Sequence, residues 1–136
     1  MPYEKITHKD RLSQAGLRPT RQRLRLSEWL FTGEDKHFTA EDLHRDVKGG
    51  DEPVSLATVY NTLSAFTQAG LLKTVTVDAS RVYYDTNIDS HFHFYDEEGH
   101  ELSDISSEGV EITGLPNLPE GTDVDRIDII IRTRKG

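Results

Sequence analysis

The chain contains no cysteine. This absence excludes disulfide bonds, cysteine nucleophiles and zinc sites built from thiolates, so no structural zinc held by four cysteines is expected. The chain also lacks an apolar run long enough to span a membrane, and residues 1–11 lack the apolar core of a signal peptide. We therefore expect a soluble cytoplasmic protein that does not act at a membrane.

Positive charge is in short supply, because the net charge is −8. The deficit is unevenly distributed along the chain. Residues 1–31 hold seven Lys/Arg against three acids, and residues 1–87 hold twelve of each sign. The last 49 residues carry four Lys/Arg and twelve Asp/Glu, so they account for the whole negative balance. This asymmetry predicts two functional halves, of which only the first can approach phosphate.

Acidic residues are absent from residues 55–70, whose sequence is SLATVYNTLSAFTQAG. Ser55 is a suitable helix N-cap, and Gly70 suits the left-handed position after a helix end. The predicted apolar stripe consists of Leu56, Val59, Leu63 and Phe66. The predicted outer face consists of Thr58, Tyr60, Asn61, Thr62, Ala65 and Gln68. Since this uncharged face can approach a polyanion and still offer donors and acceptors, we interpret the segment as a DNA recognition helix.

The neighbouring segments have the order of a winged helix-turn-helix. Helices are predicted over residues 9–15 and 19–33, and a third begins at Thr39 with a capping-box-like pattern. A β-hairpin is predicted over residues 72–85. The start of the second helix carries a cluster of four basic residues, Arg18, Arg21, Arg23 and Arg25. The cluster could bind a phosphate group, or it could simply be a charged surface exposed to water. We assign residues 1–86 to a winged-helix DNA-binding domain.

Residues 87–136 predict a second, mostly β domain. Strands are expected over residues 91–95, 101–105 and 123–134, whereas residues 106–119 are too rich in Gly, Pro and Ser for a long helix. A sheet of so few short strands is marginal alone, so we expect a second subunit to complete it. The predicted fold class is α+β, an N-terminal winged helix-turn-helix followed by a small α/β dimerisation domain.

Candidate ligands concentrate where the two halves join. His91 and His93 lie two residues apart on a predicted strand, so both imidazoles project from one face. Asp85 and Asp104 are oxygen donors nearby in the element order, and His37 precedes the third helix. Mixed histidine and carboxylate donors suit Fe²⁺, Mn²⁺ or Zn²⁺, and imidazole pairs also suit haem iron. Because the H-x-H pattern also occurs in strands that bind nothing, these residues alone do not decide whether the chain binds a metal ion, haem or neither.

Several segments resemble the ferric uptake regulator superfamily. They are AEDLH at 40–44, SLATVYNTLSAFTQAGLL at 55–72, and the His91/His93 pair before an acidic hairpin. Within it, GLRPTRQR at 16–23, YYDTN at 83–87 and the closing segment 118–134 are most similar to the iron response regulator branch of alphaproteobacteria. The resemblance implies a dimeric transcription regulator, not an enzyme, that binds palindromic AT-rich operator DNA. For that branch it implies haem-responsive control of haem-biosynthesis and iron genes, with a haem-synthesising enzyme as a candidate partner.

The resemblance also implies DNA contacts. Tyr60 matches a tyrosine that contacts base edges, and Asn61, where many members have arginine, suits adenine. Arg18, Arg21, Arg23 and Thr58 match positions near the phosphate backbone, and we also assign Ser55 to the DNA-binding surface.

The same resemblance implies a regulatory metal site formed by His37, His91, His93 and Asp104. Asp85 falls one residue away from a glutamate ligand of that site. Glu111 falls near a second site that expects a histidine at position 126, but Arg126 cannot bind a cation.

Departures from the family pattern leave three hypotheses. The C-x-x-C pairs and the cysteine haem motif are absent, so haem would require histidine. His91 and His93 are too close to clamp both faces of one porphyrin, which leaves a third residue such as His37 or His100, or a haem shared by two subunits. The hypotheses are a haem-sensitive regulator, a direct Fe/Mn-sensing repressor, and a small cupin-like metalloenzyme. The enzyme hypothesis lacks an acid–base pair and leaves the recognition helix unexplained.

Overall fold

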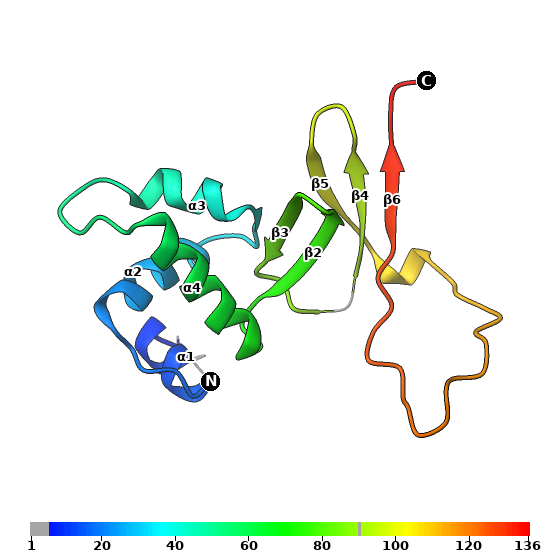
Figure 1. The fold of residues 1–136 in the computed structure, drawn as a ribbon, viewed down its shortest axis with the longest axis horizontal. Coiled ribbons are helices and arrows are strands. Elements are labelled where there is room, and N and C mark those ends of the chain that lie inside the picture. The colour runs from blue at the N-terminus through cyan, green and yellow to red at the C-terminus, as the bar shows by residue number, and fades with distance from the viewer. Residues whose placement is uncertain (1–5, 90) are drawn as a thin grey trace, which may run out of the picture. The chain divides into compact units, whose positions relative to one another are not determined.

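The structure is a computed structural model, and it describes residues 6–89 and 91–136. The chain forms two compact units, Met1–Ile88 and Asp89–Gly136 (Figure 1). Among the described residues, no helix combines the length and apolarity needed to cross a membrane.

The first unit contains helices and a small antiparallel sheet. Its elements are α1 (His8–Gln14), α2 (Arg21–Leu30), β1 (His37–Phe38), α3 (Ala40–Val47), α4 (Leu56–Gln68), β2 (Lys73–Asp78) and β3 (Arg81–Asp85). Each helix begins after a hydroxyl side chain that accepts a hydrogen bond from the backbone N–H three residues later; these caps are Thr7, Thr20, Thr39 and Ser55. The predicted cap at Ser55 and the predicted capping box at Thr39 are therefore confirmed.

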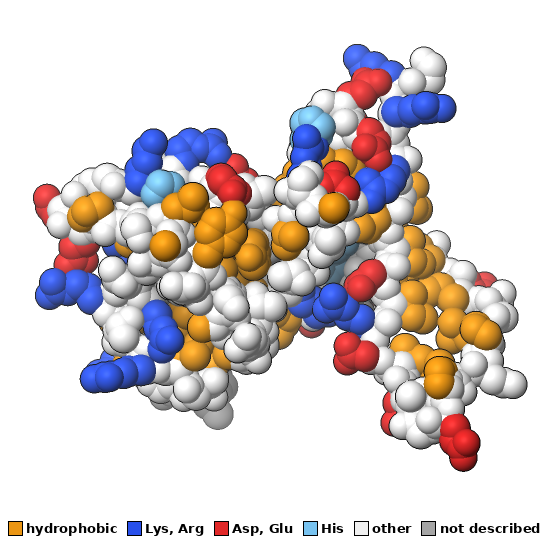
Figure 2. Space-filling model, viewed as in Figure 1, with side chains coloured by type: hydrophobic (Ala, Val, Ile, Leu, Met, Phe, Trp, Pro, Cys, Tyr) orange, Lys and Arg blue, Asp and Glu red, His pale blue; other side chains and the backbone are white. Residues whose placement is uncertain are grey.

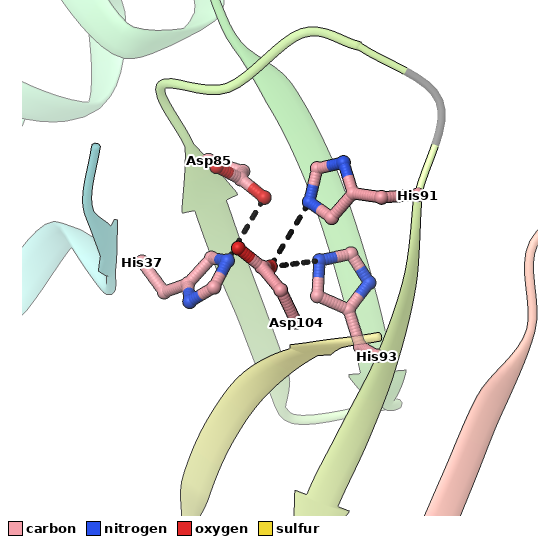
Figure 3. A group of neighbouring side chains, drawn as sticks. All are labelled: His37, Asp85, His91, His93 and Asp104. Atoms are coloured by element: carbon pink, nitrogen blue, oxygen red, sulfur yellow. Dashed lines mark hydrogen bonds and ion pairs between the residues drawn. The ribbon is translucent and has the colours of Figure 1, made fainter. Parts of the chain in front are cut away.

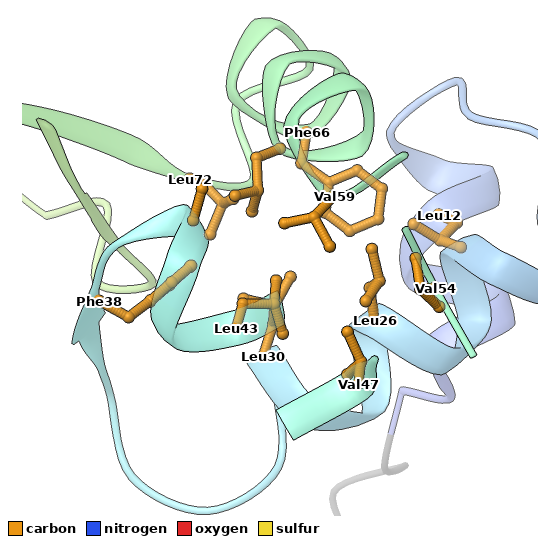
Figure 4. Packing of buried hydrophobic residues seen from close by; sticks show 12 residues of the cluster. Leu12, Leu26, Leu30, Phe38, Leu43, Val47, Val54, Val59, Phe66 and Leu72 are labelled. Atoms are coloured by element: carbon orange, nitrogen blue, oxygen red, sulfur yellow. The ribbon is translucent and has the colours of Figure 1, made fainter. Parts of the chain in front are cut away.

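A single apolar core holds the helices of this unit together (Figure 4). Its members include Leu12, Leu26, Leu30, Phe38, Leu43, Val47, Val54, Val59, Leu63, Phe66 and Leu72. Two predictions for α4 were wrong. Leu56 is 36% exposed, because the first turn of α4 lies at the margin of the core, and Thr62 is 6% exposed rather than on the outer face. The buried positions 59, 62, 63 and 66 still follow helical spacing.

The sheet of the first unit has the strand order β1-β3-β2. The hairpin β2–β3 agrees with the prediction, and its turn is held by Asp78, whose carboxylate accepts from the Ser80 N–H and hydroxyl. Strand β1 was not predicted. It pairs antiparallel with β3 in a register that sets His37 opposite Asp85. Helices followed by a hairpin, with a short strand added at its edge, make up the expected winged-helix domain.

The second unit is mostly β. It contains β4 (Phe92–Asp96), β5 (Glu101–Ile105), the 3₁₀ turn η1 (Ser107–Gly109) and β6 (Ile130–Thr133), with the strand order β5-β4-β6. The predicted strand at 101–105 is confirmed. The predicted strand at 123–134 was too long, because only Ile130–Thr133 pairs, in parallel with β4. The two units together confirm the α+β class.

The second unit leaves several large apolar side chains exposed, and many follow the long segment between η1 and β6 (Figure 2). They are Phe94, Ile112, Leu115, Leu118, Val124, Ile127 and Ile131. Apolar exposure on this scale is characteristic of a surface that a protein partner covers.

Candidate DNA-binding surface and metal ligands

A groove on the first unit collects much of the predicted DNA-contacting set. It is lined by Arg18, Thr20, Gln22, Arg23, Thr58, Asn61 and Thr62. The N-terminal turns of α2 and α4 both border it, and neither contains an acidic side chain. Arg23 is anchored there, because its guanidinium donates to the Arg18 carbonyl oxygen at 3.1 Å. Two helix N-termini with two arginines favour an anion such as a phosphate.

Two predicted residues have other surroundings. Arg21 lines a separate hollow with His8, Arg25 and Glu52, and it forms an exposed ion pair with Glu52 at 3.3 Å. Ser55 acts as the N-cap of α4: its oxygen accepts from the Thr58 N–H at 3.2 Å. The structure therefore brings Arg18, Arg23, Thr58 and Asn61 to one groove and leaves Arg21 outside it.

Tyr60 projects from the exposed side of α4 and is 43% exposed. Its hydroxyl donates a 2.5 Å hydrogen bond to Oε1 of Glu41 in the first turn of α3. This bond raises the pKa of the Tyr60 hydroxyl above its ordinary value, with smaller contributions from burial and from the negative charge of Glu41. The role of Glu41 could not be predicted from the sequence, since no local pattern links two residues that lie 19 positions apart.

The first unit supplies one pair of candidate metal ligands, His37 and Asp85. His37 Nε2 lies 3.0 Å from Asp85 Oδ2, across the β1–β3 pairing (Figure 3). The other carboxylate oxygen of Asp85 accepts from the Asn87 N–H at 2.8 Å, which fixes the orientation of the carboxylate. Asp85, a weaker candidate in the sequence, is thus a buried carboxylate that faces an imidazole.

The second unit supplies a set of three, His91, His93 and Asp104 (Figure 3). Asp104 Oδ1 lies 3.1 Å from His91 Nε2 and 3.5 Å from His93 Nε2. The imidazole centroids are 4.6 Å apart, so the two rings share one side as predicted. His91 precedes β4, and the antiparallel register sets His93 opposite Asp104.

The orientation of His91 suits a metal ligand. Its Nδ1 lies 2.6 Å from the Asp89 carbonyl oxygen, which can only accept, so Nδ1 carries a proton. In the neutral imidazole, Nε2 then presents a lone pair toward the Asp104 carboxylate, and two acceptors at 3.1 Å need a shared proton or a cation between them. A backbone carbonyl that fixes the tautomer is also the usual outer partner of a ligating histidine. The donor chemistry therefore fits a divalent cation.

The weaker candidates lie elsewhere in the second unit. His100 lies in the β4–β5 turn, and its Nδ1 lies 3.1 Å from the Tyr95 hydroxyl, at the opposite end of the hairpin from His93 and Asp104. Glu111 is exposed in the segment after η1. Arg126 forms an ion pair with Asp128 at 3.1 Å.

A winged-helix unit with a basic groove, followed by a β unit with histidine and carboxylate donors, defines a class of ligand-responsive DNA-binding protein. The ferric uptake regulator family pattern matches residues 14–125. The chain is 31% identical over 101 residues to the ferric uptake regulation protein of Pseudomonas fluorescens, covering 74% of this chain and 82% of the relative. It is also 31% identical over 100 residues to the peroxide operon regulator of Bacillus subtilis, covering 74% and 68%.

A solved structure has the same fold. The ferric uptake regulator of Pseudomonas aeruginosa with manganese aligns with a TM-score of 0.74 and 24% identity, covering 96% of this chain and 98% of that one. The chain belongs to the ferric uptake regulator family, whose members are metal-responsive, dimeric, DNA-binding transcription regulators and not enzymes.

Proposed function

We propose that the chain regulates transcription as a homodimer that binds operator DNA through α4 and responds to a divalent cation. The groove between the N-terminal turns of α2 and α4 carries this proposal. It offers Arg18 and Arg23 to phosphate and Asn61 to a base edge, with no acidic side chain among its described lining residues. The apolar surface of the second unit supports a partner subunit, and a two-fold dimer would present two α4 helices to a palindromic operator.

Base recognition in this proposal falls to Tyr60 and Asn61. An asparagine carboxamide pairs bidentately with N6 and N7 of adenine, and an aromatic ring packs on the thymine methyl group. Both contacts favour A·T pairs in the major groove, so we expect AT-rich operators.

A gel-shift assay with an operator selected from random DNA tests the DNA-binding part. Tyr60→Ala should weaken operator binding by about 1–3 kcal/mol, roughly 5- to 150-fold, as for loss of a base contact. Gln68→Ala is the matched control: Gln68 belongs to the same exposed face but lies in the last turn of α4, and it is the N-terminal residues of a recognition helix that contact base edges. Equal binding by the Tyr60 variant and wild type would exclude α4 as the recognition helix.

Arg23→Ala and Arg21→Ala form a second pair of test variant and control. Arg23→Ala should weaken binding to all sequences and reduce the slope of log K against log salt by about 1. Arg21→Ala should change that slope less, because Arg21 lies outside the groove beside Glu52.

For the regulatory part, we propose that one cation takes ligands from both His37–Asp85 and the set His91, His93 and Asp104. Only residues 86–90 separate Asp85 from His91, which limits their Cα separation to about 20 Å at full extension. Histidine with carboxylate suits Mn²⁺, Fe²⁺ or Zn²⁺, and the aligned regulator of Pseudomonas aeruginosa was solved with manganese. The positive charge of a bound cation would attract the donor atoms of both sets to one ion.

Operator binding in the presence of Mn²⁺ or a chelator tests this part. Mn²⁺ should raise operator affinity of the wild type, and Asp85→Asn and His93→Ala should each abolish most of that increase. His44→Ala is the control, since His44 lies in the last turn of α3 and belongs to neither donor set. A response to Mn²⁺ that survives both ligand substitutions would contradict the assigned ligands.

A second candidate function is haem-responsive control of the iron response regulator type, with a haem-synthesising enzyme as a partner. The segments 16–23, 83–87 and 118–134 favour it. Because both imidazoles of His91 and His93 approach one carboxylate from the same side, we propose that at most one of them ligates a given haem. Haem titration should then produce a Soret band and release operator DNA, and His91→Ala/His93→Ala should abolish both. Haem that binds without changing operator affinity would exclude this function.

A further inference from the structure

The hydrogen bond between Tyr60 and Glu41 bears on which bases the recognition helix accepts. Glu41 is held in place, because it lies in the first turn of α3, where the capping box of Thr39 and Asp42 fixes the backbone. Helix α3 in turn packs on α4. The backbone that carries Glu41 is therefore held in place, and its exposed carboxylate lies within hydrogen-bond reach of Tyr60 on the proposed DNA-binding face.

The hydroxyl group of tyrosine has one proton, and in this structure that proton is donated to Glu41. A charge-assisted O–H···O⁻ bond is about twice as strong as a neutral one, so a base would compete poorly for the proton. The hydroxyl oxygen keeps its lone pairs and can still accept. Tyr60 thus presents an acceptor and an apolar ring to DNA, and no donor.

The bases differ in what they offer to such a group. In the major groove guanine offers only acceptors, N7 and O6, whereas adenine offers an amino donor and thymine offers a methyl group. A tyrosine hydroxyl without a free proton can accept from adenine, and its ring can pack on thymine, but it cannot donate to guanine.

We propose that Glu41 is a specificity-determining residue that selects against guanine by keeping the Tyr60 hydroxyl proton away from DNA. This inference rests on the proposed function, in which α4 contacts base edges. Glu41 does not need to touch DNA for this role, since it acts through Tyr60.

The experiment measures the affinity of full-length protein, with Mn²⁺, for the selected operator and for variants carrying each base at each position. The position contacted by Tyr60 is the one where Tyr60→Ala changes base preference, because that substitution removes the ring as well as the hydroxyl. At that position, Glu41→Ala should raise the affinity for guanine relative to thymine by about fivefold, the size of one net hydrogen bond. In the Tyr60→Phe background, Glu41→Ala should leave this ratio unchanged.

Glu41→Gln separates the hydrogen bond from the charge. The carboxamide oxygen can still accept from Tyr60 but without charge assistance, so the guanine ratio should lie between those of wild type and Glu41→Ala. Loss of the negative charge should raise affinity for all sequences to a similar extent. Two results would overturn the inference. One is a guanine-to-thymine affinity ratio that Glu41→Ala leaves unchanged. The other is a change in this ratio that is equally large when Glu41→Ala is made in the Tyr60→Phe background. If Tyr60→Ala does not affect operator binding at all, the proposed function itself fails, which distinguishes the two failures.

Discussion

The capping box of α3 permits a quantitative prediction about the first unit. Thr39 Oγ1 accepts from the Asp42 N–H at 3.1 Å, and the Asp42 carboxylate accepts from the Thr39 N–H at 3.0 Å. Thr39→Ala removes the first of these bonds and leaves a helix N–H without its partner. Loss of a threonine N-cap costs about 0.5–2 kcal/mol. We expect Thr39→Ala to fall in the upper half of that range, about 1–2 kcal/mol, because α3 has only eight residues and the cap is reciprocal.

Thr20 provides the matched control, because it caps α2 through a single, longer bond. The Arg23 N–H donates to Thr20 Oγ1 at 3.3 Å, and an arginine side chain cannot return a bond as an acceptor. Thr20→Ala should therefore cost less than Thr39→Ala, about 0.5–1 kcal/mol.

Urea unfolding followed by the fluorescence of Trp29 measures both variants. Trp29 is the single tryptophan of the chain. Its indole N–H donates to Asp46 of α3 at 2.9 Å, and its ring contacts Phe38 edge-on with a 5.1 Å centroid separation. The signal therefore reports the α2–α3 contact. With a slope of about 1–3 kcal/mol per molar urea, the midpoint should fall by roughly 0.3–2 M for Thr39→Ala, depending on the slope. A midpoint equal to that of Thr20→Ala or higher would refute the reasoning.

Other contacts of the described residues give three further predictions. Burial alone would raise the pKa of Asp42, but hydrogen bonds from Thr39 and a neighbouring arginine outweigh it, so the pKa is lower in the folded state. The resulting stabilisation is present above about pH 4 and lost as pH falls through the folded pKa, so the difference in unfolding free energy between wild type and Asp42→Asn should shrink on acidification. Mn²⁺ at about 100 times its Kd should stabilise wild type by about 2.7 kcal/mol and Asp85→Asn far less, as measured by thermal unfolding with and without the metal. Because the hydrogen bond to Glu41 raises the pKa of Tyr60, NMR titration of ¹³C-labelled tyrosine should give a lower Tyr60 pKa in Glu41→Ala; no change would contradict that assignment.

Helical periodicity predicted the position of α4 and three of its four stripe residues, Val59, Leu63 and Phe66. It failed at Leu56 and Thr62 for one reason. Periodicity gives the direction in which a side chain points, but it does not give where the neighbouring elements end. Leu56 extends beyond the core, while Thr62 lies beside the buried stripe and is covered although it is polar.

Strand prediction succeeded where pairing is local and failed where it is not. The hairpins β2–β3 and β4–β5 join strands that are adjacent in sequence, and their turns carry recognisable residues. Strand β1 has only two residues and pairs with β3, where His37 and Asp85 are 48 positions apart, so no periodic signal could reveal it. Strand β6 pairs in parallel with β4, and its predicted extent came from β-branched residues that mostly do not enter the ladder.

The candidate ligands could likewise be predicted where the spacing is local, but not where it depends on the pairing of distant strands. The two-residue spacing of His91 and His93 correctly predicted a shared side, because a strand repeats every two residues. The contact between His37 and Asp85 depends on β1, so spacing alone could not establish it. The resemblance matched His37 to a ligand of the family's metal site, but it placed Asp85 only loosely, whereas the structure buries that carboxylate against His37.

Strand β1 and the start of α3 connect the candidate ligand pair His37–Asp85 to the proposed recognition helix within one unit. His37 faces Asp85 in β1, Thr39 caps the next helix, and Glu41 in its first turn binds the Tyr60 hydroxyl. A change in ligand state at His37 is thus four residues of chain away from the side chain that orients Tyr60. If this path carries the metal response, Thr39→Ala should leave the affinity for Mn²⁺ unchanged. It should reduce the ratio of operator affinities measured with and without Mn²⁺. This ratio is typically about 5- to 150-fold in allosteric systems. Isothermal titration gives the first quantity and gel shifts give the second. An unchanged ratio would show that the metal acts on DNA binding by another route, such as the spacing of the two α4 helices in the dimer.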